Sequence, residues 1–149
     1  VINTNKKGNA WWIFNFPFCY IDEPIFVLTC DNITNINFKL IERDYIKKGQ
    51  PECFLVPTKP IKKLEGDYIL RKNNIVTKLS RKIKSDIYCS GIQIINPYRI
   101  NKIVKNTEDF NKVWSKLISK RKLIVSDVLP KNWFTIDNLK QLTLYRRKY

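Results

Sequence analysis

PIFVLTCDNITNINFKLIERDYIKKGQPECFLV, residues 24–56, contains short apolar runs at both ends and an amphipathic stretch between them. The first run, residues 24–29, is rich in β-branched side chains and closes with the polar loop 30–32, as in a strand buried on both faces. Apolar residues then recur at helical intervals up to Gly49, a natural helix C-cap. Residues 53–56 form the second run. This order predicts a βαβ unit and therefore a parallel sheet.

The flanking sequence predicts further short elements of an α/β domain. Residues 68–72 and 75–79 flank Asn73-Asn74 and predict a β-hairpin. Residues 87–95 predict a strand that contains Gly91, and a glycine inside a strand indicates close approach of another group to the backbone. We expect further strands at 123–128 and 133–136, and helices that open at Gly8, span 108–120, and follow an N-cap at Asn138.

Length and composition fit one globular domain over residues 1–149. The 149 residues are 44% hydrophobic and include only 4 Gly and 7 Pro, unlike a disordered or fibrous chain. No apolar run approaches the ~18 residues of a membrane span, and no signal peptide opens the sequence. We therefore expect a soluble, cytoplasmic protein with no membrane partner. The sequence begins with Val1 and contains no methionine, which indicates that residues are missing upstream.

The residue types present exclude several classes of catalytic site. The chain has no histidine, which excludes Ser-His-Asp and Cys-His catalysis and His-ligated metals. No P-loop or dinucleotide-binding motif occurs. Four cysteines lie far apart without a Cys-x-x-Cys pair, as expected for reduced thiols rather than for a zinc ribbon or a redox pair; they are Cys19, Cys30, Cys53 and Cys89.

The net charge of +15, from 28 Lys and Arg against 13 Asp and Glu, suggests an anionic partner such as nucleic acid. Tyr145 stands beside the basic residues 146–148, and aromatic and basic side chains in alternation suit single-strand binding. However, Asn, Ile and Lys are abundant throughout, as A/T-rich coding produces whatever the function. No nucleic-acid-binding motif is visible, so a basic nucleic-acid-binding domain is the weaker alternative.

Asp31, directly after a buried strand, is the first candidate functional residue. Open α/β sheets bind ligands at the carboxyl ends of their strands, and Mg²⁺ binds through one or two carboxylates plus substrate phosphates. The alternative, an Asx turn that only caps the loop, suits the spacing equally well. Lys82, beside Arg81, offers a fixed positive charge to a phosphate, although a solvated basic cluster fits the sequence better. The turn at Gly8 offers backbone amides to a ligand, or simply begins an aromatic core segment.

Successive segments resemble, in order, blocks of the sugar-phosphate nucleotidyltransferases, the nucleoside-diphosphate-sugar pyrophosphorylases: Gly8-Asn9-Ala10, Pro24–Asp31, Val76–Lys82, Ser90–Pro97 and Trp133–Asp137. The resemblance covers nearly the whole chain but only the later part of the family's catalytic domain. Nothing matches the Gly-rich loop whose Arg and Lys hold the nucleoside triphosphate. It implies a three-layer, Rossmann-like, mostly parallel sheet of the nucleotidyltransferase type, incomplete at the N-terminus, with a small β-hairpin excursion.

The resemblance also implies roles for particular residues. Asp31 matches the aspartate that holds Mg²⁺ between the triphosphate and the sugar phosphate. Lys82 matches a lysine that contacts the sugar phosphate, with Arg81 and Ile83 in place of the family's Glu and Pro. These two matched positions, Asp31 and Lys82, are the predicted catalytic residues.

Further matches predict substrate contacts and a second metal ligand. Gly8 and Asn9 match a turn at the nucleobase, and residues Cys89, Ser90 and Gly91 match the strand that lines the sugar pocket. The family's second metal-binding Asp falls at Thr135. Asp137, two residues later, points the same way along a strand and is the candidate replacement.

The implied reaction is attack by a sugar 1-phosphate oxygen on the α-phosphorus of a nucleoside triphosphate, with Mg²⁺ as cofactor and pyrophosphate as the second product. One alternative is a non-catalytic remnant that partners or regulates an intact enzyme. In another, a separate chain supplies the missing N-terminal part, or the protein is a homo-oligomer, because an incomplete α/β sheet exposes an apolar edge. The sequence identifies neither the nucleotide nor the sugar.

Overall fold

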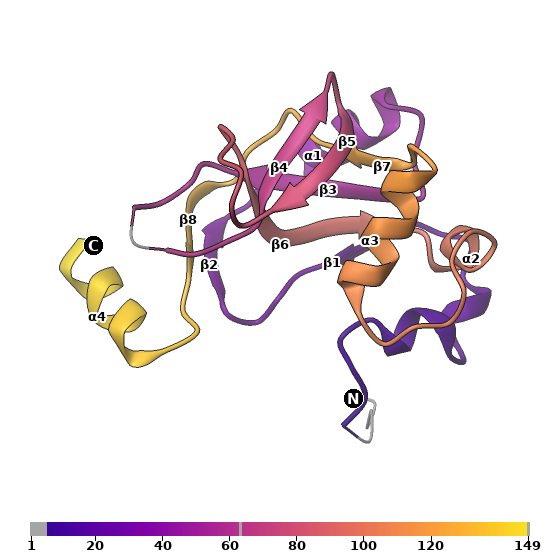
Figure 1. Cartoon of the computed structure of the whole chain (residues 1–149), viewed down its shortest axis with the longest axis horizontal. Helices are drawn as coiled ribbons and strands as arrows, with labels where there is room; N and C mark the ends of the chain where they lie inside the picture. Colours follow the sequence, from indigo (N-terminus) through magenta and orange to yellow (C-terminus); the bar gives the residue numbers. More distant parts are fainter. Residues whose placement is uncertain (1–5, 63, 149) are drawn as a thin grey trace.

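The computed structural model describes residues 6–62 and 64–148, which form a mixed six-stranded sheet, a separate two-stranded sheet and helices on both faces (Figure 1). The large sheet has the order β1-β6-β3-β7-β5-β4. Its strands are β1 (Ile25–Val27), β3 (Cys53–Thr58), β4 (Tyr68–Lys72), β5 (Ile75–Ser80), β6 (Tyr88–Ile95) and β7 (Leu123–Val125). The small sheet pairs β2 (Asn32–Asn35) with β8 (Lys131–Thr135). The α-helices are α1 (Phe38–Lys47), α2 (Pro97–Asn101), α3 (Phe110–Ser119) and α4 (Leu139–Lys148).

The α/β class is confirmed, but the sheet is mixed where the sequence predicts mostly parallel pairing. Among the described strands only β3 and β7 pair in parallel, and β6 runs antiparallel between β1 and β3. β1, β3 and β7 nevertheless share one direction, so the predicted β1–α1–β3 unit exists with β6 inserted between its strands. An apolar run carries no mark of strand direction, which is why the sequence did not reveal this insertion.

The sheet has a packed layer on each face. All six residues of β3 are buried, and the first four alternate between two apolar clusters. Cys53 and Leu55 face the cluster formed with α2, α3 and the N-terminal segment, whereas Phe54 and Val56 face the cluster formed with α1, β8 and α4. This period of two yields the predicted three-layer arrangement. Each such apolar side chain stabilises the fold by about 1.5–3 kcal/mol when fully buried.

Local signals set the ends of several elements. The Asn37 side chain accepts a hydrogen bond from the N–H of Leu40 at 3.1 Å and caps α1. Gly49 follows α1 with φ +80°, as the sequence predicts for a helix C-cap. Asn73 adopts φ 56° in the turn between β4 and β5, which confirms the hairpin.

The N-terminal segment differs from the predicted helix. It forms two 3₁₀ helices, η1 (Trp11–Phe14) and η2 (Phe18–Tyr20). Pro17 lacks the N–H that a continuing helix would need, and the Asn15 side chain donates to the carbonyl of Trp11 at 2.7 Å.

In the ranges that the structure describes, every helix is too short or too polar to span a bilayer.

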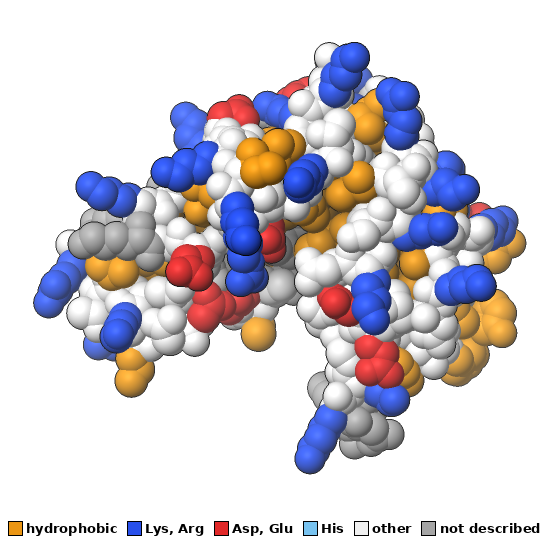
Figure 2. All heavy atoms as spheres, viewed as in Figure 1, with side chains coloured by type: hydrophobic (Ala, Val, Ile, Leu, Met, Phe, Trp, Pro, Cys, Tyr) orange, Lys and Arg blue, Asp and Glu red, His pale blue; other side chains and the backbone are white. Residues whose placement is uncertain are grey.

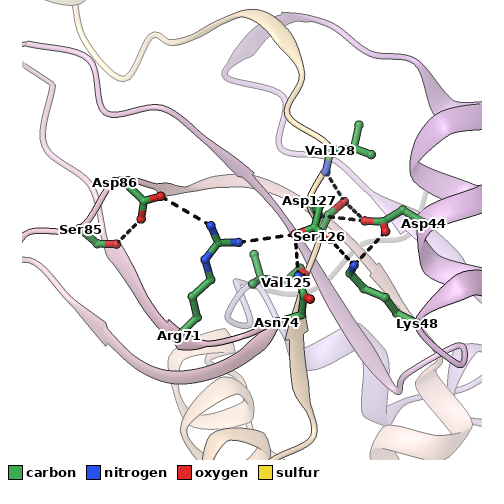
Figure 3. Close-up of polar contacts among 10 residues, drawn as sticks. All are labelled: Asp44, Lys48, Arg71, Asn74, Ser85, Asp86, Val125, Ser126, Asp127 and Val128. Atoms are coloured by element: carbon green, nitrogen blue, oxygen red, sulfur yellow. Dashed lines mark hydrogen bonds and ion pairs between the residues drawn. The ribbon is translucent and has the colours of Figure 1, made fainter.

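A polar network joins α1 to the loop after β7 and to the β4–β5 hairpin (Figure 3). The Asp44 carboxylate accepts from the Ser126 hydroxyl at 2.6 Å and from the N–H of Asp127 at 2.9 Å. Lys48 Nζ lies 3.0 Å from Asp44 Oδ1 and 2.5 Å from Asp127 Oδ2. Arg71 from β4 reaches Asp127 at 3.8 Å. These contacts fix the carboxyl end of β7 against the helix layer.

Candidate active site

Asp31 lies where the chain leaves β1 and turns toward β2. The N–H of Ile136 donates to the backbone carbonyl of Asp31 at 3.0 Å, and Asn32 pairs with Thr135 across the β2–β8 ladder. The small sheet therefore holds Asp31 beside the end of β8. Figure 2 shows acidic side chains gathered near β2 and β8, at the edge of a hollow between α4 and the N-terminal segment.

The two oxygens of the Asp31 carboxylate differ in their hydrogen bonds. The Thr135 hydroxyl donates to Oδ2 at 3.3 Å. Oδ1 is buried and accepts no hydrogen bond from any residue that the structure describes. Burial raises the pKa of Asp31, but interactions with the Thr29 hydroxyl, its own backbone, Asp137 and Thr135 outweigh it and bring the pKa below its ordinary 3.8. The carboxylate is thus ionised at neutral pH, with an oxygen available for a ligand.

Asp137 is the second carboxylate at this place. Its side chain interacts with that of Asp31, and its N–H donates to the side chain of Gln141 in α4. Asn138 accepts from the N–H of Gln141 at 3.1 Å and begins the helix, as predicted. Thr135 and Asp137 both face Asp31, as expected for residues i and i+2 at a strand end. We call Asp31 and Asp137 the acid pair.

The acid pair suits a hard divalent cation. The described residues contain no group of three or more His, Cys, Asp or Glu side chains that could hold a metal. Two carboxylates with an unpartnered buried oxygen match Mg²⁺, which keeps several positions for water and substrate oxygens. The donors present therefore fit the ion that the sequence predicts.

β6 bulges beside the acid pair. Its register with β3 shifts at Ser90 and Gly91, and Gly91 adopts φ +81°. A Cβ at Gly91 would lie 2.6 Å from Thr29 Oγ1 and 2.9 Å from Asn32 Nδ2. The close approach predicted at Gly91 is thus made by the β1–β2 loop that carries Asp31, and a side chain there would push that loop away.

The backbone carbonyl of Ser90 connects the elements that carry the acid pair. It accepts from the Asn32 side chain at 2.6 Å and from Trp133 Nε1 at 2.9 Å. Asn32 follows Asp31, and Trp133 lies on β8. Neither contact was expected from the sequence, although Asn32 stands in the polar loop that drew attention to Asp31. Cys89, next along β6, is half-buried, and desolvation of its thiol together with nearby Asp67 raises its pKa to about 12, so the thiol stays protonated.

Arg81, rather than Lys82, lines a pocket together with Asp137. A pocket of about 640 Å³ is lined by Arg81, Asp137 and residues around the start of α4. Arg81 Nε lies 3.3 Å from Asp67 Oδ1, which holds the guanidinium near the pocket. Lys82 is exposed, has no ion pair with a described residue and does not line this pocket. Sequence reasoning treated Arg81 only as a replaced neighbour of Lys82.

Gly8 and Asn9 lie elsewhere, against the start of α3. The N–H of Gly8 donates to the Glu108 side chain at 3.3 Å, and a Cβ at Gly8 would lie 2.2 Å from the Glu108 carbonyl oxygen. The Asn9 side chain accepts from the N–H of Phe110 at 3.2 Å. Figure 1 shows this segment apart from β2 and β8. The structure thus brings Asp31, Asp137, Ser90 and Gly91 together and leaves Gly8 and Asn9 outside.

The fold is that of the sugar-phosphate nucleotidyltransferases, or pyrophosphorylases, so the predicted resemblance is confirmed for the fold. A putative glucose-1-phosphate thymidylyltransferase from Bacillus anthracis matches with a TM-score of 0.72 and 11% identity over 96% of this chain. The inositol-1-phosphate CTP transferase from T. maritima matches with a TM-score of 0.68 and 17% identity over 97% of it.

UDP-glucose pyrophosphorylase complexed with UDP-glucose is also similar, with a TM-score of 0.65 and 14% identity over 96% of this chain. The chain spans 61–63% of the length of these three proteins. No family model and no curated protein matches the sequence. The likeness is therefore one of structure, at low sequence identity.

Proposed function

We propose that this chain is the sugar-phosphate-handling part of a nucleotidyltransferase that joins a nucleoside triphosphate to a sugar 1-phosphate and releases pyrophosphate. The observation that carries the proposal is the acid pair, an ionised Asp31 facing Asp137 at the carboxyl end of β1. Open α/β sheets bind phosphorylated ligands at this end. The similar solved proteins carry the corresponding activities in their names, and this chain covers only part of their length.

The residues of the chain would act by position and charge. Asp31 and Asp137 would hold Mg²⁺, whose charge when bound neutralises phosphate oxygens. Thr135, through its hydrogen bond to Oδ2, orients Asp31 so that Oδ1 points away from that contact. Arg81 at the pocket, and Lys82 in the exposed loop beside it, offer positive charge to a phosphate. Reactions at phosphorus need little covalent help, so such positioning supplies most of the acceleration.

The test uses the protein as its source cell makes it. The intact mass is measured first, and the purified protein is then given Mg²⁺ with panels of nucleoside triphosphates and sugar 1-phosphates. We expect pyrophosphate release that requires both substrates. An absence of release across the panels, from a protein that binds neither substrate, would contradict the proposal.

A non-catalytic partner of an intact enzyme is the second candidate. Thr135 favours it, because the resemblance leads one to expect a carboxylate at this position. In that case the source-cell protein would have the mass of this chain, bind a longer chain, and release no pyrophosphate by itself. Co-purification from the source cell distinguishes the two candidates.

A further inference from the structure

A basic groove lies between α3 and the loop that joins α2 to it, and it shares no lining residue with the pocket at Asp137. Its volume is about 750 Å³, and none of its lining residues is acidic. Six of the ten lining residues are lysines, against 28 Lys and Arg in the whole chain of 149. We call it the lysine groove; its lysines are Lys102, Lys105, Lys112, Lys116, Lys120 and Lys122.

One wall of the lysine groove is a row of like charges on α3. Lys112, Lys116 and Lys120 stand four residues apart, so they share one helix face at steps of about 6 Å. Like charges at this spacing repel one another, and α3 contains no acidic residue to offset them, although Lys116 in the last turn and the C-cap Lys120 interact favourably with the helix C-terminus. Abundant lysine codons explain many lysines but not their concentration on one face.

Most of these charges are unneutralised. Lys122 pairs with Glu52, and Lys102 Nζ lies 3.9 Å from the centre of the Tyr98 ring. The other four lysines form no ion pair within residues 6–62 and 64–148, and all six are exposed. Figure 2 shows Lys and Arg side chains over the region of α2 and α3. A concave surface of one charge sign concentrates the field and attracts a polyanion.

The form of the groove favours a flexible chain of phosphates. Lysines stand on both walls, where a flat membrane would touch only the rim. No exposed aromatic or large apolar side chain lines the groove for insertion into lipid, and its apolar residues, Ile103 and Val104, are half-buried or buried. The lack of aromatic lining also removes base stacking, the usual source of base preference. Ammonium groups act as point charges that suit phosphate oxygens.

We propose that the lysine groove binds the phosphate backbone of single-stranded nucleic acid without sequence preference. Affinity then depends on salt, because each phosphate neutralised by a lysine releases counterions. The activity is separate from nucleotidyl transfer and stands whether or not that function is confirmed.

Fluorescence anisotropy with a labelled single-stranded RNA of about 12 nucleotides, within the usual site sizes, tests this binding across a salt series. The test variant is the triple change Lys112→Gln, Lys116→Gln and Lys120→Gln. The control triple is Lys47→Gln, Lys72→Gln and Lys78→Gln, exposed positions outside the groove that give the same net charge. Circular dichroism melting establishes that both variants are folded.

We expect saturable micromolar binding at physiological salt, the usual range for sequence-independent contacts. The groove triple should lower affinity at least tenfold and reduce the slope of log affinity against log salt by about 2, from about 0.7 per lost phosphate contact. The control triple should change affinity less than threefold. Equal weakening by both triples would overturn the groove assignment. Stronger binding to vesicles with phosphatidylserine than to RNA, or no binding by the unchanged protein, would overturn the proposed partner.

Discussion

The hydroxyl of Thr135 donates to Oδ2 of Asp31 at 3.3 Å, from the position where the family resemblance leads one to expect a second carboxylate. A neutral donor therefore supports Asp31 from the strand, and the second carboxyl group comes from Asp137, two residues later, whose side chain interacts with that of Asp31. The site therefore still has two carboxyl groups, but the second one lies two residues later than expected, just past the end of β8.

Replacing Asp31 by Asn tests the acid pair directly. Asn keeps the shape and the hydrogen bond from Thr135 but removes the charge, so we expect at least a tenfold loss of Mn²⁺ affinity, followed by electron paramagnetic resonance. The melting temperature should stay within a few degrees of the original. The exposed Glu42→Gln on α1 is the control and should leave Mn²⁺ affinity unchanged. Unaltered Mn²⁺ binding in Asp31→Asn would show that the ion sits elsewhere.

Thr135→Asp should strengthen cation binding and destabilise the protein when no divalent cation is bound. A carboxylate beside Asp31 raises the pKa of Asp31 by like-charge repulsion, and Thr135 is only 9% exposed. We expect a lower melting temperature without divalent ions and recovery of most of the loss in millimolar Mg²⁺. Thr135→Asn carries no charge and should show no such recovery. If Mg²⁺ does not restore Thr135→Asp, the pair does not bind the ion.

Gly91→Ala should be more costly than Gly49→Ala, although both glycines have a φ near +80°. The left-handed backbone costs about 1–2 kcal/mol at either position. At Gly91 the added methyl also meets Thr29 at 2.6 Å, which adds about 1–3 kcal/mol of overpacking, whereas Gly49 has open space. Urea denaturation measures both losses. Equal losses of the free energy of unfolding would mean that the β1–β2 loop moves away from the added methyl group at no energetic cost.

Asp44→Ala should lower the free energy of unfolding by about 2 kcal/mol at neutral pH, because it leaves the Ser126 hydroxyl and the Asp127 N–H without their acceptor. Burial opposes ionisation of Asp44, but hydrogen bonds from Ser126 and Lys48 dominate and lower its pKa from 3.8. A lowered folded-state pKa means that this stability is present above pH 3.8 and is lost as pH falls through the folded pKa.

The free energy of unfolding of Asp44→Ala should therefore differ less from that of the original protein below about pH 4 than at neutral pH. Urea titrations at both pH values measure this difference. Glu42→Gln provides the exposed control on the same helix. If the difference in free energy of unfolding is the same in strong acid, the packing of the Asp44 side chain, rather than its charge, stabilises the network.

The fold was largely predictable wherever a local signal sets a boundary. Gly49 follows α1 and Asn73 turns the hairpin, each through a left-handed backbone, whereas Asn138 caps the start of α4 with its side chain. Strand order was not predictable, because the insertion of β6 between β1 and β3 depends on contacts between distant segments. The 3₁₀ helices of the N-terminal segment were missed because an aromatic stripe has similar spacing in both helix types.

The site was predictable in part. Asp31 stood out because it follows a strand that the sequence predicts to be buried on both faces, and the alternation of strand side chains pointed to Asp137. That prediction of burial is wrong, because β1 is a half-buried strand at the edge of the sheet. Arg81 and Trp133 were not assigned to the site, since their place depends on how distant segments meet: Arg81 lines a pocket with Asp137, and Trp133 on β8 donates to the carbonyl of Ser90. The assignment of Gly8, Asn9 and Lys82 to substrate contacts stays a prediction.

The contacts of Ser90 have an evolutionary consequence. The acceptor that joins Asn32 and Trp133 is a main-chain carbonyl, so no substitution at position 90 removes it from the chain. The side chain at position 90 can therefore be exchanged without loss of the acceptor, whereas exchange of Asn32 or Trp133 removes a donor.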